Sequence, residues 1–319
     1  MKKTVKGKII KGVGGLYTVL INSNEEALGG ELVRSRARGA LRHSGETPLA
    51  GDSVTLEYDA DKVEAKRKDD EASFVIESIN ERKNALIRPP LANLDYLYIT
   101  MAAASPAPVL LTVDKLLSIC VYNGIEPIVV ISKCELDRNY AEELAALYRK
   151  AGFSAVVTSS ATGEGIEELR RSVNSLPEGS ISAFSGASGV GKSTLMNSLF
   201  PELALSTSEV SKKTERGRHT TRQTELFVIR DEKEPVFLAD TPGFTMLDFE
   251  QFDFFTLEDL PSTMRDFERY IGECKYKKCT HTKEDGCAIL EAVRSGEVSE
   301  SRHKSYLALY ETLKAKKKW

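Results

Sequence analysis

No apolar stretch in the sequence approaches the roughly 20 residues that a helix needs to cross a bilayer, so we do not expect an integral membrane protein. The N-terminus, MKKTVKGKIIKGVGG, also lacks the apolar core and the small-residue cleavage site of a secretory signal. Cysteine is scarce, with five in 319 residues, and so few thiols rarely form disulfides in a reducing compartment. These absences lead us to expect a cytoplasmic protein with no membrane partner.

An excess of positive charge is lacking too, since the formal net charge is −3. We therefore do not expect the whole surface to bind polyanions, but the charge is distributed unevenly along the chain. Solvated surface side chains and nucleic-acid contact explain basic runs equally well, so both interpretations stay open at this point. The basic residues gather at Lys2, Lys3, Lys6, Lys8 and Lys11, at Arg34, Arg36, Arg38 and Arg42, and at Lys314, Lys316, Lys317 and Lys318.

The chain is too long for one ordinary hydrophobic core, and its pattern changes along its length. Residues 1–75 contain short alternating segments separated by turns, which predict an all-β, OB-like barrel. The two prolines in NALIRPPL, residues 84–91, indicate a linker. Residues 251–319 predict a small helical domain that contains three of the five cysteines.

Residues 76–250 are predicted to form an α/β domain, because strand-like and helix-like segments alternate along them. Such alternation is typical of a mostly parallel, doubly wound sheet. The expected strands cover residues 94–100, 127–131, 154–158, 181–184 and 236–240, and the expected helices cover 113–122, 140–151, 165–173 and 194–199.

Residues 186–193 fit the pattern G-x-x-x-x-G-K-[ST], after an expected strand and before a helix-like segment. Glycines there let backbone N–H groups turn inward onto phosphate oxygens, assisted by the positive end of the helix. Lys192 is predicted to bridge the β and γ phosphates, and the Ser193 hydroxyl to bind Mg²⁺. A fortuitous turn is the weaker interpretation. The predicted phosphate loop is Gly186, Ala187, Ser188, Gly189, Val190, Gly191, Lys192, Ser193 and Thr194.

A second phosphate-side element is the segment VFLADTPG, residues 236–243, in which an apolar strand is followed by an Asp and a Gly. Asp240 is predicted to hold Mg²⁺ through water, and the Gly243 N–H to sense the γ-phosphate. Asp and Gly are common turn residues, so this pattern gains its weight from the phosphate loop that precedes it.

Guanine is read by a carboxylate that accepts its N1 and N2 hydrogens, and each such charged hydrogen bond contributes about 1.5–3 kcal/mol. Two segments resemble the usual Asn-Lys-x-Asp pattern, namely SKCE at residues 132–135 and TKED at residues 282–285. Only the first directly follows an expected strand. We therefore predict that Ser132, Lys133 and Glu135 read the base, although Ser replaces the usual Asn and Glu the usual Asp.

The segment SSATGEG, residues 159–165, supports this choice, because it resembles the loop whose backbone contacts the guanine oxygen. Ser159 and Ser160 are its predicted contacts. With both assignments, the guanine motifs precede the phosphate motifs, which is a circular permutation of the usual order. The segment after Gly243 leads into the C-terminal domain, so hydrolysis could reposition that domain.

Together these residues resemble the circularly permuted, ribosome-associated GTPases that act in late maturation of the small ribosomal subunit. The resemblance covers nearly the whole chain and is most specific in the permuted order, in Gly217-Arg218-His219-Thr220-Thr221, and in Cys274-x4-Cys279-x-His281-x5-Cys287. It implies GTP as substrate, Mg²⁺, one structural Zn²⁺, and the small ribosomal subunit with its rRNA as partner. It also implies slow intrinsic turnover that the ribosome raises. A monomer is the default expectation.

The resemblance further implies roles in the first switch. Phe244 stands where other GTPases place a water-orienting glutamine, so His219 becomes the candidate for positioning water, with a structural histidine as the competing interpretation. Either Thr220 or Thr221 is expected to bind Mg²⁺, and the choice stays open because Arg222 replaces the third Thr of the family.

Cys274, Cys279, His281 and Cys287 are expected to close a tetrahedral Cys₃His zinc site, which suits a small domain that cannot fill a core by itself. Buried free cysteines are the competing interpretation. The surrounding Lys275, Lys277, Lys278 and Lys283 are expected to face rRNA phosphate.

Two other functions remain open from the sequence. One is an ATP-using P-loop phosphotransferase, which would prefer ATP and offer a small-molecule pocket. The other is an RNA-binding zinc protein with a vestigial P-loop, which would bind RNA equally with either nucleotide and show no turnover.

Overall fold

The computed structural model describes residues 2–25, 28–39, 41, 46–60, 74–86, 89–201, 224–231, 233–240 and 255–316. The chain divides into two compact units, each made of segments that are not contiguous in sequence. The first takes its residues from Met1–Tyr96, Asn174–Phe184 and Thr207–Phe244, and the second from Leu97–Val173, Ser185–Ser206 and Thr245–Trp319. The division into domains at 1–75, 76–250 and 251–319 stays a prediction. Among the described residues, no helix is long and apolar enough to cross a membrane.

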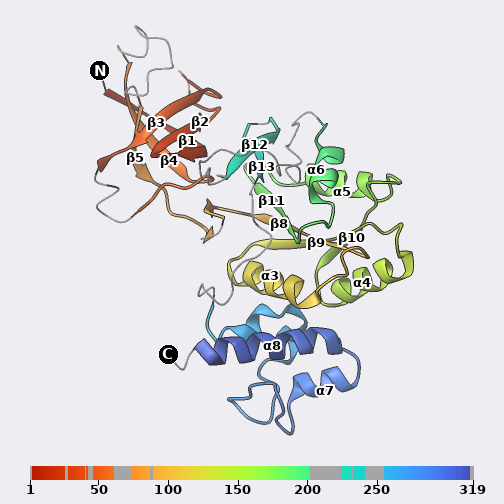
Figure 1. Ribbon diagram of the computed structural model, residues 1–319. Coiled ribbons are helices and arrows are strands. Elements are labelled where there is room, and N and C mark those ends of the chain that lie inside the picture. The colour runs from red at the N-terminus through yellow and green to blue at the C-terminus, as the bar shows by residue number, and fades with distance from the viewer. Residues whose placement is uncertain are drawn as a thin grey trace, which may run out of the picture. The chain divides into compact units, whose positions relative to one another are not determined.

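Five described strands of the first unit form a closed barrel (Figure 1). The strand β1 pairs antiparallel with β2 and β4, β2 with β3, and β4 with β5, while β3 and β5 pair in parallel and close the ring. Alternate side chains face inward along each strand and form a core that includes Ile9, Val19, Leu56 and Phe74. The predicted OB-like barrel is confirmed. Its strands are β1 (Lys2–Val13), β2 (Leu16–Ile21), β3 (Leu32–Ala37), β4 (Ser53–Asp59) and β5 (Phe74–Ile79).

The first unit also contains strands from the phosphate side of the α/β domain. The strands β11 (Ile181–Gly186), whose last two residues belong to the second unit, and β13 (Val236–Asp240) pair in parallel. The strand β12 (Glu225–Arg230) pairs antiparallel with β13 and meets β1 of the barrel. No predicted element corresponds to β12. The predicted linker contains a short antiparallel ladder between β6 (Ala85–Leu86) and β7 (Leu91–Ala92).

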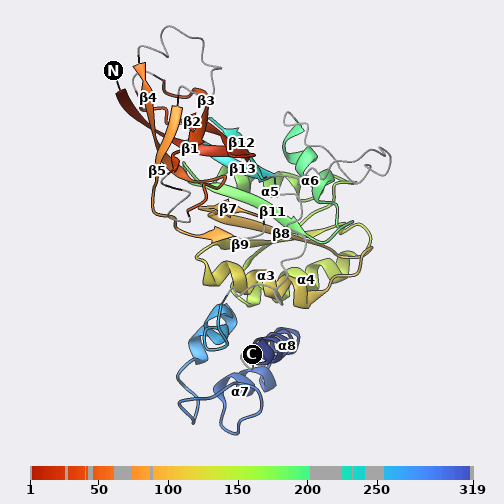
Figure 2. The same cartoon turned by 60° about the vertical axis from the view of Figure 1, so that its left-hand side comes forward.

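The second unit contains strands β8 (Tyr96–Ala102), β9 (Glu126–Ser132) and β10 (Ser154–Val157), in the order β10-β9-β8. The strands β9 and β10 run parallel, and nearly all their residues are buried, as expected when helices cover a parallel sheet. The helices α3 and α4 lie on one face of these strands (Figures 1 and 2). The predicted α/β fold is confirmed. Its helices are α3 (Leu110–Tyr122), α4 (Arg138–Lys150), α5 (Ile166–Asn174) and α6 (Lys192–Leu199).

The C-terminal part of the second unit consists of short helical elements beside one long helix. Within the segment predicted to be helical, the described residues first form two short 3₁₀-helices, η2 (Leu260–Thr263) and η3 (Arg265–Tyr270). The helix α7 (Ala288–Arg294) directly follows the last cysteine of the Cys/His segment. The long helix α8 (Glu300–Lys316) lies within the segment predicted to be helical and packs on α3.

A buried ion network attaches α8 to α3. Arg302 of α8 is 1% exposed and donates to Asp114 of α3 (Nη1–Oδ1 2.6 Å) and to Asp266 of η3 (Nη2–Oδ1 2.8 Å). Burial alone would lower the pKa of Arg302, but the two carboxylates outweigh it and raise the pKa, so the guanidinium stays charged. Removing one partner of such a buried pair typically costs about 3–5 kcal/mol, because the remaining charge is left buried and unpaired, so the packing of α8 on α3 requires all three side chains.

Candidate functional site

The predicted phosphate loop joins β11 to α6, as the sequence pattern requires. A Cβ atom at Gly186 would lie 2.2 Å from the carbonyl oxygen of Thr100, so only glycine fits there. Gly189 (φ 77°) and Gly191 (φ 91°) adopt backbone conformations that favour glycine. No side chain caps the N-terminus of α6, so its first N–H groups have no side-chain acceptor at the cap. The loop therefore has the geometry that suits backbone binding of an anion.

The Lys192 side chain folds back over this loop. Its Nζ donates to the carbonyl oxygens of Gly186 (2.7 Å) and Ala187 (2.9 Å). Residues 187–189 are exposed, whereas Val190 is buried and anchors the loop. An exposed loop with an ammonium group held beside its backbone is the arrangement in which a lysine can reach bound phosphates.

The predicted guanine loop follows β9 and is hydrogen-bonded to the phosphate loop. Ser132 is buried, and its Oγ lies 2.6 Å from the carbonyl oxygen of Val190 and 3.1 Å from that of Met101. Lys133 Nζ donates to the carbonyl oxygens of Gly189 (2.6 Å) and Ser105 (2.5 Å). Two motifs that lie more than 50 residues apart in the sequence are thus brought together.

Two carboxylates follow Lys133, and the structure distinguishes them. Asp137 caps α4, because its side chain accepts a hydrogen bond from the Tyr140 N–H (3.0 Å). Glu135 is exposed within the loop itself. Glu135 is therefore the better placed carboxylate for contact with a base.

The competing TKED segment is engaged in its own loop. Glu284 accepts hydrogen bonds from the backbone N–H groups of Thr280 (2.8 Å) and Thr282 (2.9 Å). The segment lies within the Cys/His cluster and follows no strand, as the sequence indicated. This geometry favours Ser132, Lys133 and Glu135 as the base-reading set.

The second predicted guanine loop lies beside the first. Ser159 is buried and its Oγ accepts the N–H of Thr162 (3.1 Å), while Ser160 is partly exposed. An ion pair between Arg138 and Glu164 joins the two loops, and Cys134 Sγ lies 3.6 Å from Glu164 Oε2. Sequence reasoning missed this link, because an ion pair between distant residues has no spacing pattern.

Asp240 is partly exposed at the C-terminal end of β13. Because Ala239 lies opposite Ala183 in the parallel pair β13–β11, Asp240 lies at the end of this pair from which β11 continues into the phosphate loop. The remaining predicted site residues, His219, Thr220, Thr221 and Gly243, lie outside the described residues.

The predicted metal ligands form one cluster. The ligand atoms of Cys274, Cys279, His281 and Cys287 all lie within 4.8 Å of one another. Cys274 and Cys287 Sγ are 3.9 Å apart, and each lies 3.5 Å from His281 Nδ1. A tetrahedral zinc with Zn–S bonds of about 2.3 Å and a Zn–N bond of about 2.0–2.1 Å separates its ligands by about 3.8 Å (S–S) and 3.5 Å (S–N). The residues present therefore fit a zinc ion.

The surroundings of the cluster also suit zinc. The backbone N–H groups of Ala288 and Leu290 donate to the sulfurs of Cys274 (3.4 Å) and Cys287 (3.5 Å). Such N–H groups stabilise thiolate ligands. Burial and the neighbouring thiols raise the pKa of Cys279 to about 12, so a bound cation must displace its proton. Burial lowers the pKa of His281, which keeps the imidazole neutral, as a ligand must be.

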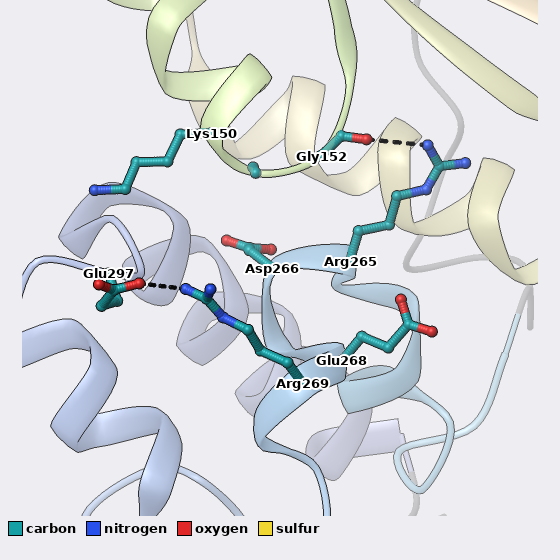
Figure 3. Close-up of a pocket in the computed structure, with 8 residues that line it drawn as sticks. Lys150, Gly152, Arg265, Asp266, Glu268, Arg269 and Glu297 are labelled. Carbon is teal, nitrogen blue, oxygen red and sulfur yellow. Dashed lines mark hydrogen bonds and ion pairs between the residues drawn. The ribbon is translucent and has the colours of Figure 1, made fainter.

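A hollow between α4 and the C-terminal elements is lined by none of the predicted site residues (Figure 3). Its cationic side chains already have partners. Lys150 Nζ donates to the carbonyl oxygen of Gly296 (2.5 Å), Arg265 to that of Gly152 (3.3 Å), and Arg269 pairs with Glu297. We interpret the contacts around this hollow as structural, because they attach the C-terminal elements to α4 and the turn that follows it.

Two family profiles match this chain. The profile described as RsgA GTPase matches residues 79–250, and the profile described as RsgA N-terminal domain matches residues 6–65. A relative from Bacillus pumilus, named small ribosomal subunit biogenesis GTPase RsgA, is 38% identical over 317 residues, which cover 98% of each chain.

Two solved structures are similar over nearly the whole chain. One is YloQ, titled a circularly permuted GTPase, with a TM-score of 0.75 and 29% identity over 98% of this chain and 96% of that one. The other is YjeQ from Thermotoga maritima, with the same TM-score and identity over 98% of this chain and 99% of that one. These similarities confirm the predicted circularly permuted P-loop fold.

Proposed function

Because this chain belongs to the RsgA GTPase family, we propose that the GTP it hydrolyses serves a late step in the biogenesis of the small ribosomal subunit, and that this subunit stimulates its turnover. The observation that supports the proposal is that the predicted guanine loop contacts the predicted phosphate loop, which follows it in the sequence. Ser132 and Lys133 make this contact with Val190 and Gly189. The alternative of a metabolic kinase does not predict these contacts between the two motifs, whereas a permuted GTPase does, so the geometry favours GTP.

At the phosphates, we assign the contacts to the loop from Gly186 to Thr194. Its backbone N–H groups and Lys192 would bind the β and γ phosphates. The Ser193 hydroxyl and the Asp240 carboxylate are oxygen donors of the kind that Mg²⁺ prefers. When bound, that cation neutralises charge on the phosphate oxygens. Around the base, Glu135 would accept the guanine hydrogens while Ser159 and Ser160 contact its oxygen.

The proposal includes the switch residues that the sequence identifies. His219 would position the attacking water, Thr220 or Thr221 would bind Mg²⁺, and Gly243 would sense the γ-phosphate. Their support is the resemblance of the sequence to the family.

On the partner side, we propose contact with rRNA, a monomeric state and a cytoplasmic location. The loop around the metal ligands supports RNA contact, since Lys275, Lys277 and Lys278 are exposed on it. Exposed ammonium groups bind phosphate and release counterions, so salt should weaken this contact. The Cys₃His cluster would hold one structural zinc.

Stimulation by the subunit is tested by phosphate release from GTP and ATP, with and without purified small ribosomal subunits. We expect slow release from GTP alone and an increase of one or more orders of magnitude with the subunit, because a partner can complete the arrangement of catalytic groups. Large subunits serve as the matched control and should give little increase. Preference for ATP, or equal rates with and without the subunit, would contradict the proposal.

Base recognition is tested by replacing Glu135 with glutamine. Glutamine has an NH₂ donor in place of one carboxylate oxygen acceptor. This donor would face the guanine amino group, which is itself a donor. We expect the affinity for GDP to fall by about 10- to 100-fold, which corresponds to the loss of one charged hydrogen bond. Xanthosine diphosphate carries an oxygen in place of that amino group, so its affinity should rise. Both affinities are measured by equilibrium titration.

Two further variants make this result specific. Glu143 of α4 is an exposed glutamate near the same loop, and Glu143→Gln should leave both affinities unchanged. Glu135→Asp keeps the carboxylate on the shorter arm that most GTPases use and should retain the preference for guanine. Unchanged guanine preference in Glu135→Gln would refute the assignment of this residue.

A further inference from the structure

A row of three charged residues crosses the strands β1, β12 and β13. Lys11 of the barrel lies opposite Glu225, and Glu225 lies opposite Asp240 on its other side. Directly opposite residues in antiparallel strands have side chains on the same face of the sheet. Lys11 and Glu225 indeed form an ion pair (Nζ–Oε2 2.5 Å). The row therefore connects a barrel lysine to the carboxylate proposed to hold magnesium.

The signs of the charges in this row are informative. Two carboxylates directly opposite each other on neighbouring strands repel and are destabilising. Lys11 offsets this repulsion from the far side of Glu225. Both side chains of the ion pair are only about a third exposed, at 37% and 35%, so solvent screens the pair less than a fully exposed one.

A second contact joins β1 directly to β13. Lys8, three residues before Lys11, lies with its Nζ 5.1 Å from the ring centroid of Phe237, which is three residues before Asp240. Its Nζ also donates to the carbonyl oxygen of Gly179 (3.2 Å). Burial lowers the pKa of Lys8, as expected for an ammonium inserted between packed elements. The strand β1 is thus held to β12 through Lys11 and contacts β13 through Lys8.

We infer that Lys11 and Glu225 are positioning residues for Asp240, and that through them the barrel sets how strongly this carboxylate attracts a divalent cation. The inference rests on the proposed function, because it takes Asp240 as a magnesium-holding residue. Glu225 is one strand spacing from Asp240, about 4.8 Å, and Lys11 is two spacings away. Glu225 therefore increases the negative potential at Asp240, and Lys11 cancels part of that increase. A phosphate bound to the barrel would compete with Glu225 for the same ammonium group.

Charge-removing variants of similar size test this role. Glu225→Gln should raise by about two- to fivefold the Mg²⁺ concentration that half-maximally tightens binding of fluorescent GDP. Lys11→Met should lower that Mg²⁺ concentration by about twofold. This shift is smaller because the ammonium group of Lys11 is further from Asp240 than the carboxylate of Glu225 is. The double variant K11M/E225Q should return close to the wild-type value. A merely structural role would shift both single variants in the same direction and the double variant further.

Two readouts avoid reliance on turnover. Binding of GDP under a Mg²⁺ titration involves no hydrolysis. Thermal unfolding without nucleotide or Mg²⁺ should show coupling between the Lys11 and Glu225 substitutions in a double-mutant cycle. The ion pair between Lys2 and Glu57 (2.7 Å) also joins two barrel strands, and K2M and E57Q provide matched controls that should not change the Mg²⁺ dependence.

Asp240→Asn separates failure of the inference from failure of the proposed site. If D240N leaves the Mg²⁺ dependence unchanged, the proposed magnesium site is wrong and the inference fails with it. If D240N weakens Mg²⁺ binding while the Lys11 and Glu225 variants show no shift, or shifts of the same sign, the inference alone is overturned. Opposite shifts that cancel in the double variant would establish it.

Discussion

Lys192→Ala is expected to lower GTP turnover by about 10²–10³-fold, the usual effect of removing one preorganised donor from a site where charge develops. Lys192 Nζ lies over the phosphate loop, within hydrogen-bond distance of Gly186 and Ala187. Alanine is an excellent helix former at this first position of α6, so the fold should be retained. Phosphate release under single-turnover conditions measures the chemical step, and circular dichroism checks the fold.

Lys233→Ala is the matched control for this result. Lys233 is an exposed lysine in the turn between β12 and β13, and its loss changes the net charge by the same amount. We expect turnover of this variant to equal that of the wild type. Affinity for GDP should fall less than the rate in Lys192→Ala, because GDP lacks the γ-phosphate on which the lysine also acts. A rate within about tenfold of wild type would place the catalytic cation elsewhere.

The strand, loop and helix that contain the predicted phosphate loop could be predicted because the signal is local. The glycines, Lys192 and Ser193 are contiguous, and their strand and helix follow from adjacent patterns. The Cys/His cluster could be predicted for the same reason, since the spacing of its four residues is short and their chemistry distinctive. The barrel was predicted from alternation, because each strand buries every second residue.

Features that depend on tertiary contacts could not be predicted in the same way. From the sequence, SKCE is preferred to TKED because SKCE directly follows an expected strand. The structure adds direct contacts from Ser132 and Lys133 to the predicted phosphate loop. The Arg138–Glu164 link and the Arg302 network join residues far apart in the chain. The sequence does not distinguish an arginine in a buried ion network from one that is exposed to solvent, so the role of Arg302 could not be predicted.

The expectation that hydrolysis repositions the C-terminal domain stays a prediction, but the structure constrains it. The described C-terminal elements are attached to α3 through Arg302 and to the turn after α4 through Arg265. A displacement of these elements would have to carry α3 and α4 with them or break a buried ion pair. If Asp240 holds magnesium as proposed, the row from Lys11 to Asp240 would link the nucleotide to the barrel without such a break.

Removal of zinc is expected to unfold the segment around the Cys/His cluster. Structural zinc contributes about 10–16 kcal/mol in zinc-finger peptides, so the loss of one of four ligands should weaken binding by about 10²–10³-fold. In Cys279→Ser we expect zinc content by elemental analysis to fall from one per chain towards zero. Protease cleavage should then appear within residues 271–287. The same cleavage is expected when a chelator removes zinc from the wild type.

The effect should be local, because α8 has a second attachment. Arg302 joins α8 to Asp114 without any metal, so the nucleotide loops should stay folded and intrinsic GTP turnover should remain close to wild type. Cys120→Ala is the matched control, since Cys120 is buried in α3 outside the cluster and should retain zinc. Acid should release zinc as thiolates regain protons, with affinity falling as the pH falls. Full zinc content in Cys279→Ser, or equal zinc loss in Cys120→Ala, would show that this cluster is not the metal site.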